Sequence, residues 1–121
     1  MDLLPEIVRI RLTRQSEALC ESRNANLPAE LGKAQFDTLS DGVMFSKAHY
    51  LCDSMHVDYV SPVAKVTWVA ELNRWRIYMP QSLDNSEKVV WVTYPFLPTS
   101  DELSIVLHEL EKDPQESFWS A

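Results

Sequence analysis

The sequence predicts an α+β fold in one domain: an N-terminal helix, an antiparallel sheet of about five strands, and a C-terminal helix packed on one face of the sheet. Three observations lead to this prediction. Residues 62–79 alternate between apolar and polar side chains on both sides of a short polar turn, which is typical of a β-hairpin. Residues 103–110 carry apolar side chains at helical spacing. The chain has 121 residues, the size of one ordinary domain, so residues 1–121 are assigned to a single domain.

Residues 3–23 are expected to form the first helix, with Pro5 in its first turn. Apolar side chains recur near helical spacing on one face of this segment: Ile7, Val8, Leu12, Leu19 and Cys20. Three arginines interrupt the stripe at positions on the opposite face or at its borders: Arg9, Arg11 and Arg14. Because nearby glutamates balance them, these arginines are interpreted as a solvated helix face rather than a phosphate-binding site.

Two strands are expected between residues 34 and 51, joined at Asp41-Gly42, because glycine accepts a positive φ without steric cost. A strict two-residue turn would set Leu39 against Met44 and Thr38 against Phe45, which mixes apolar and polar residues on both faces. A longer loop or a bulge is an equal alternative. Residues 52–61 are expected to connect this hairpin to the next.

The hairpin of residues 62–79 is expected to turn at residues 71–74. If Ala70 faces Trp75, then Trp68 faces Ile77, and one face of the hairpin is wholly apolar. Trp68 and Trp75 are therefore expected in the core. The other face carries polar side chains that stand together: Lys65, Thr67, Arg76 and Tyr78, with Arg74 beside them.

Residues 80–88 are polar enough for a loop, and residues 89–94 are expected to form a last strand that Pro95 ends. Thr99 and Glu102 fit a capping box at the start of the closing helix. The apolar stripe of this helix consists of Leu103, Val106, Leu107 and Leu110, and Asp113-Pro114 ends the helix. Adjacent Phe118 and Trp119 in the tail predict docking. They pack either on this chain's own sheet, which is favoured, or in another subunit's groove.

Charge and hydropathy indicate the cellular location and the kinds of partner to expect. No apolar run approaches the ~18 to 20 residues that a membrane span requires, and the N-terminus lacks the features of a signal peptide. We therefore expect a cytoplasmic protein in which Cys20 and Cys52 are reduced and buried rather than joined. The formal charge is −7, with 11 Lys and Arg against 18 Asp and Glu. This balance disfavours nucleic-acid binding, which draws on clustered basic side chains.

Several short motifs resemble a known family. In chain order they are Cys20-Glu21-x-Arg23, Ser61-Pro62-Val63-Ala64-Lys65, Trp75-Arg76-Ile77-Tyr78, Trp91 with Tyr94, and Asp113-Pro114 followed by Phe118-Trp119. Together they resemble the bacterial domain-of-unknown-function family numbered 3024 over nearly the whole chain. The chain departs from that pattern at residues 80–88, which are longer and lack the basic residues frequent there. The resemblance implies a small cytoplasmic bacterial protein with no assigned activity and no catalytic residue to carry over.

A metal site is one chemical candidate. His49, Cys52 and His56 have ligand types at a spacing that zinc could use, with Asp53 or Asp58 as a fourth donor. An ordinary loop with a buried cysteine is the preferred interpretation, because structural zinc sites usually show a second paired knuckle. No metal and no cofactor are therefore expected.

Catalytic patterns are weaker still. No serine sits in a glycine-flanked elbow, and two glycines are too few for a phosphate-cradling loop. Asp84 with Glu87, and Asp101 with Glu102, are acidic pairs in loops or helix caps, which are usually solvated. We therefore expect that the protein is not an enzyme.

The remaining candidate is a binding surface on the polar face of the hairpin, made of Lys65, Thr67, Arg74, Arg76 and Tyr78. The alternative is an ordinary solvated face, with Arg76 along Tyr78 or paired with Glu71. The favoured function is a small acidic, non-catalytic interaction domain that engages an unknown protein partner or its own copy. The other hypothesis is an RNA-related role, like that of double-stranded RNA-binding domains or ribonuclease toxins, through Lys65, Arg74 and Arg76. One continuous patch joining these residues to the arginines of the first helix would favour RNA.

Overall fold

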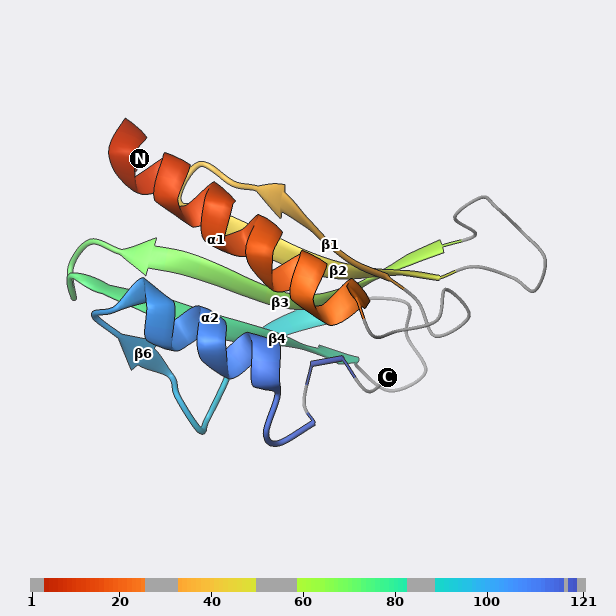
Figure 1. Cartoon of the computed structure of the whole chain (residues 1–121). Helices are drawn as coiled ribbons and strands as arrows, with labels where there is room; N and C mark the ends of the chain where they lie inside the picture. The colour runs from red at the N-terminus through yellow and green to blue at the C-terminus, as the bar shows by residue number, and fades with distance from the viewer. Residues whose placement is uncertain (1–3, 26–32, 50–58, 83–88, 117, 120–121) are drawn as a thin grey trace.

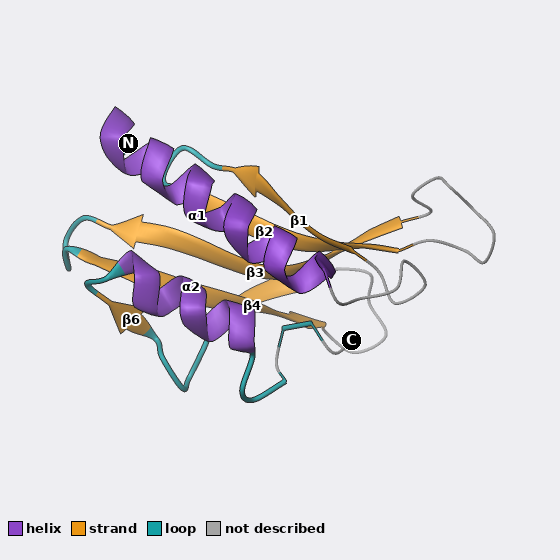
Figure 2. Cartoon of the chain, in the orientation of Figure 1, coloured by secondary structure: helices purple, strands orange, loops and turns teal. Residues whose placement is uncertain are grey.

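Two helices lie side by side on one face of an antiparallel sheet in the computed structural model (Figure 1). The structure describes residues 4–25, 33–49, 59–82, 89–116 and 118–119. Within these residues the elements are α1 (Glu6–Ala25), β1 (Lys33–Thr38), β2 (Gly42–His49), β3 (Tyr59–Val69), β4 (Arg74–Ser82), β5 (Val89–Thr93), β6 (Thr99–Ser100) and α2 (Leu103–Lys112). Figure 2 shows both helices, in purple, in front of the strands. The predicted α+β fold class is confirmed.

The sheet is an antiparallel meander with strand order β1-β2-β3-β4-β5. The short strand β6 pairs with β4 at Trp75 and Arg76, whereas β5 pairs with β4 further along, from Tyr78 to Ser82. Since β3 pairs with the other edge of β4, β5 and β6 lie end to end along the same edge. The sequence did not predict β6.

The register of the β3–β4 hairpin differs from the predicted register by two residues. Trp68 pairs with Trp75 and Val66 with Ile77, so the turn spans residues 70–73 rather than 71–74. Asn73 has a φ of 51°, a left-handed conformation that asparagine tolerates better than most residues. Because the slip is an even number of residues, every side chain stays on its predicted face.

The β1–β2 hairpin, whose register the sequence left open, does not have the pairing of a strict turn at Asp41-Gly42. Thr38 pairs with Val43, and the amide of Leu39 donates to the carbonyl of Gly42 at 2.8 Å, so the loop centres on Ser40 and Asp41. The expected reason for Gly42 is wrong, because its φ is not positive. A Cβ at Gly42 would lie 1.8 Å from the carbonyl oxygen of Val66 on β3, so glycine is required by close backbone approach.

A register shift bends β3 in its first half. Phe45 pairs with Ala64 but the next residue, Ser46, pairs with Pro62, which leaves Val63 as an extra residue in a bulge. The predicted loop at residues 80–88 begins late, because β4 continues to Ser82. Pro80 is tolerated there because β4 has passed its last pair with β3 and is hydrogen-bonded only to β5.

Both helices bury most of their predicted apolar stripe. The structure corrects one residue of the α1 stripe and the cap of α2. In α1, Leu12, Ser16, Leu19 and Cys20 are buried, but Ile7 is 71% exposed and does not belong to the stripe. In α2 the predicted stripe of leucines and Val106 is buried. The predicted capping box is wrong, because Thr99 lies in β6 and the hydroxyl of Ser100 accepts the amide of Glu102 at 3.2 Å.

The tail returns onto the chain's own sheet, as favoured. Phe118 and Trp119 are 3% and 6% exposed. Trp119 meets Phe45 of β2 edge-on with ring centroids 6.4 Å apart, and Phe118 lies 4.8 Å from Tyr94. Cys20 is a free, buried thiol, as expected. No described helix combines the length and the apolar character needed to cross a membrane.

Candidate functional site

The structure brings the five predicted binding residues onto one face of the sheet. Strand alternation directs Lys65 and Thr67 of β3, and Arg74, Arg76 and Tyr78 of β4, away from the face that packs on the helices. Lys65 pairs with Tyr78, and Thr67 pairs with Arg76. Both described helices lie on the opposite face (Figure 1). We call this set, together with Trp91, the outer face.

Trp91 joins the outer face from β5. It pairs with Pro80, two residues beyond Tyr78 on β4, and therefore projects on the same side as Tyr78. The ammonium of Lys65 lies 5.1 Å from the ring centroid of Tyr78 and 5.1 Å from that of Trp91. These are cation–π distances, so one lysine contacts two aromatic rings from two strands.

The arginines of the outer face have no ionic partner in the part of the chain that the structure describes. No ion pair there involves Lys65, Arg74 or Arg76, so the pairing of Arg76 with Glu71 that the alternative interpretation allowed does not form. The Nε atom of Arg76 is buried and has no hydrogen-bond partner among these residues. Thr67, beside it, is 8% exposed. The Nε–H of Arg76 is therefore a buried hydrogen-bond donor without an acceptor among the described residues.

The arginines of α1 do not extend this surface. Arg9, Arg11 and Arg14 lie on a helix that covers the core face, across the sheet from Lys65 and Arg76. The single continuous basic patch that would have favoured RNA is therefore not formed.

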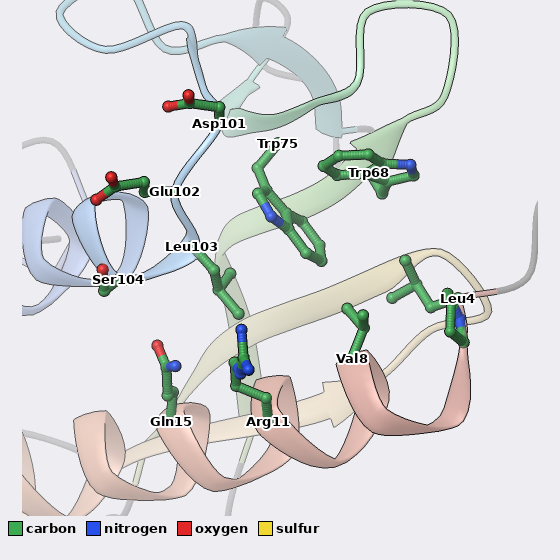
Figure 3. Close-up of a pocket in the computed structure, with 11 residues that line it drawn as sticks. Leu4, Val8, Arg11, Gln15, Trp68, Trp75, Asp101, Glu102, Leu103 and Ser104 are labelled. Atoms are coloured by element: carbon green, nitrogen blue, oxygen red, sulfur yellow. The ribbon is translucent and has the colours of Figure 1, made fainter.

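A cleft opens on the helix side of the sheet, between the beginnings of α1 and α2. Its volume is about 480 Å³, and Figure 3 shows its floor formed by Trp68 and Trp75 of the central hairpin. The apolar walls are Leu4, Val8 and Leu103. Trp75 is buried, whereas Trp68 is only partly buried, which corrects its expected place in the core. The two indoles meet edge-on with centroids 5.2 Å apart.

Polar groups enter the cleft from both helices. Arg11 and Gln15 project into it from α1, while Asp101 and Glu102 lie at its rim before α2 (Figure 3). The sequence did not predict that Arg11 and Gln15 line a cleft. Their spacing of four residues places them on one helix face, but nothing local indicates that a tryptophan pair faces them.

Burial shifts the pKa of several other described groups. The hydroxyl of Tyr94 donates to Glu109 at 2.7 Å, and burial together with this carboxylate raises the pKa of Tyr94. Burial raises the pKa of the Cys20 thiol to about 12, so this thiol is not a nucleophile near neutral pH. Burial and the charge of Lys47 lower the pKa of His49.

Most of the candidate metal ligands and acid–base residues lie outside the residues that the structure describes. These are Cys52, Asp53, His56, Asp58, Asp84 and Glu87. His49 contacts Ser61, with Nε2 2.7 Å from the hydroxyl oxygen. Among the described residues, no three His, Cys, Asp or Glu side chains gather where they could hold a metal ion.

Comparison with known families gives a match to the family described as "Domain of unknown function (DUF3024)", over residues 4–120. Neither the curated proteins nor the solved structures contain a match.

Proposed function

The chain belongs to the DUF3024 family of unknown function, and from its own side chains we propose that it is a non-catalytic interaction domain whose outer face binds an acidic segment of a partner protein. The observation that carries the proposal is the cationic and aromatic surface made by Lys65, Arg76, Tyr78 and Trp91, whose cations have no carboxylate partner among the described residues.

Charge supports an acidic partner. The chain has 18 Asp and Glu, yet no described carboxylate pairs with Lys65, Arg74 or Arg76. A carboxylate from a partner would accept charge-assisted hydrogen bonds from the exposed part of the Arg76 guanidinium. Complementary charge of this kind contributes mainly to specificity and to the rate of encounter.

The aromatic rings supply the apolar contact that such a surface needs. Tyr78 and Trp91 are both partly exposed, and interface cores are enriched in tyrosine, tryptophan and arginine. Because the contacts with Lys65 already favour this arrangement of the two rings, a partner that packs on them loses less side-chain entropy in ordering them. An aromatic platform with cations beside it is suited to a short extended segment.

A bacterial cytoplasmic setting is part of the proposal. The family resemblance implies it, and the free thiol of Cys20 is of the kind that persists in a reducing compartment.

The test measures binding of a fluorescein-labelled octaglutamate peptide, an octaglutamine control and an octauridylate RNA by fluorescence anisotropy. We expect the octaglutamate to bind most tightly, and the double variant Lys65→Gln/Arg76→Gln to weaken it by about tenfold or more. The double variant Arg9→Gln/Arg14→Gln removes the same charge from exposed positions on α1 and should leave binding unchanged.

Two results would reject the proposal. Tighter binding of octauridylate, lost in the outer-face variant, would assign the surface to RNA. Equal loss in both double variants would show that net charge alone drives the association. A third outcome is that the outer face binds a second copy of the chain. Sedimentation velocity on the protein without ligand detects it, because the wild type would then be a dimer and Lys65→Gln/Arg76→Gln would be a monomer.

A further inference from the structure

We propose that the cleft over Trp68 and Trp75 is a binding site for a small organic monocarboxylate with a flat apolar body. The body would lie on the two indoles, and the carboxylate would bind the guanidinium of Arg11. The cleft lies on the helix side of the sheet, so this site is separate from the outer face and goes beyond the function proposed above.

The size and the walls of the cleft suit a small molecule. Its volume of about 480 Å³ falls within the roughly 300–1,000 Å³ typical of ligand sites. The floor is aromatic, the sides are aliphatic, and the lining comes from α1, β3, β4 and the start of α2. Trp68 is partly exposed although it lies on the core face of the sheet, so part of its ring is available to stack on a planar group.

Arg11 gives the cleft its charge preference. No ion pair or hydrogen bond connects Arg11 to another described residue, and Figure 3 shows its guanidinium rising from α1 into the cleft beside Leu103. The carboxylates of Asp101 and Glu102 point away from the tryptophans in the same view. A planar guanidinium without a partner, set against apolar walls, matches a carboxylate with two parallel hydrogen bonds.

The beginning of α2 adds to the preference of the cleft for an anion. Glu102 occupies the N-cap in an extended conformation, and its side chain makes no capping hydrogen bond. Leu103 and Ser104 of the first turn of α2 line the cleft, and a helix N-terminus favours an anion. Gln15 supplies a neutral amide beside Arg11.

The number of charges selects a monoanion. One guanidinium faces the cleft, while two carboxylates stand at its rim. A phosphate dianion would carry excess negative charge toward Asp101 and Glu102, whereas a single carboxylate neutralises Arg11. An organic cation would place a second positive charge beside Arg11, which is unfavourable.

The experiment titrates the full chain with three probes that share one ring system: 2-naphthoate, 2-naphthamide and 2-naphthylmethylamine. Binding is followed by calorimetry, and the site is located by chemical-shift changes of the tryptophan indole resonances. We expect 2-naphthoate to bind about tenfold or more tightly than the amide, and the amine to bind most weakly.

Variants separate the charge from the apolar floor. Arg11→Gln should bring the affinity for 2-naphthoate down to that for 2-naphthamide, while Arg11→Lys should keep part of the difference. Trp68→Leu should weaken both probes by a similar factor. Arg14→Gln, an exposed arginine on the same helix outside the cleft, is the matched control and should change nothing.

The proposal is overturned if wild-type protein binds 2-naphthoate and 2-naphthamide equally, if Arg11→Gln leaves the difference intact, or if millimolar 2-naphthoate shifts no indole resonance. Binding of octaglutamate by Arg11→Gln is measured in parallel. It should be unchanged, so failure at the cleft is distinguishable from failure at the outer face.

Discussion

The indole N–H of Trp119 donates a hydrogen bond to the carbonyl oxygen of Leu110 at 2.8 Å, which ties the end of the chain to the last turn of α2. Asp113 makes this return by adopting a left-handed conformation with φ 45°, and its carboxylate accepts the amides of Phe118 and Trp119. The guanidinium carbon of Arg23 on α1 lies 4.8 Å from the centroid of the same indole ring. The tail therefore holds α1 and α2 together.

Truncating this anchor should destabilise the monomer. Trp119→Ala removes a buried ring, so we expect a loss of about 3–5 kcal/mol in the free energy of unfolding, measured by urea denaturation. Phe96→Ala, at a ring that is 62% exposed, is the matched control and should cost less than about 1 kcal/mol. Sedimentation should show an unchanged mass. A dimer that becomes monomeric would mean that the tail is exchanged between subunits.

The paired tryptophans of the central hairpin should differ in their contribution to stability. Trp75 is 4% exposed, so Trp75→Ala should cost about 3–5 kcal/mol. Trp68 is partly exposed at the cleft, so Trp68→Ala should cost only about 1–2 kcal/mol. Equal losses in chemical denaturation would show that the cleft closes over Trp68 in solution.

Gly42 should not accept a larger residue. The methyl group of alanine would meet the carbonyl oxygen of Val66 at 1.8 Å, so β2 and β3 must move apart. We expect Gly42→Ala to lower the free energy of unfolding by about 2–3 kcal/mol. Ser40→Ala, exposed in the same loop, should change it by less than about 0.5 kcal/mol. A neutral Gly42→Ala would contradict this close approach of the two strands.

Cys20 should make stability depend on alkaline pH. Burial raises the pKa of its thiol from 9.0 to about 12, so the folded state holds this proton more tightly than the unfolded state. Its contribution is therefore complete below about pH 9 and is lost as the pH rises toward 12. In a Cys52→Ala background, Cys20→Ala should flatten the fall in unfolding free energy between these limits. Parallel curves with and without Cys20 would show that its thiol titrates normally.

Periodicity within the sequence determined the elements and their faces. The two-residue alternation around Val66 and Ile77 assigned Lys65, Arg76 and Tyr78 to one face even though the predicted register was wrong, because an even slip preserves the face. The apolar stripe of α2 and its end at Asp113-Pro114 were equally local signals. The adjacent aromatic residues of the tail predicted docking, because two rings left in water would lose the free energy that burying their apolar surface provides.

Tertiary structure alone decided which side chains meet. Trp91 lies beside Lys65 only because β5 pairs with β4, and Gly42 is needed only because β2 approaches the backbone of Val66. The cleft depends on α1 and α2 beginning on the same side of the hairpin, so that Arg11 rises toward Trp68. Local patterns encode which face of its own strand or helix a residue occupies, because the period of the element sets that face. Its neighbours are set by packing between segments far apart in the chain, and no local period records that packing.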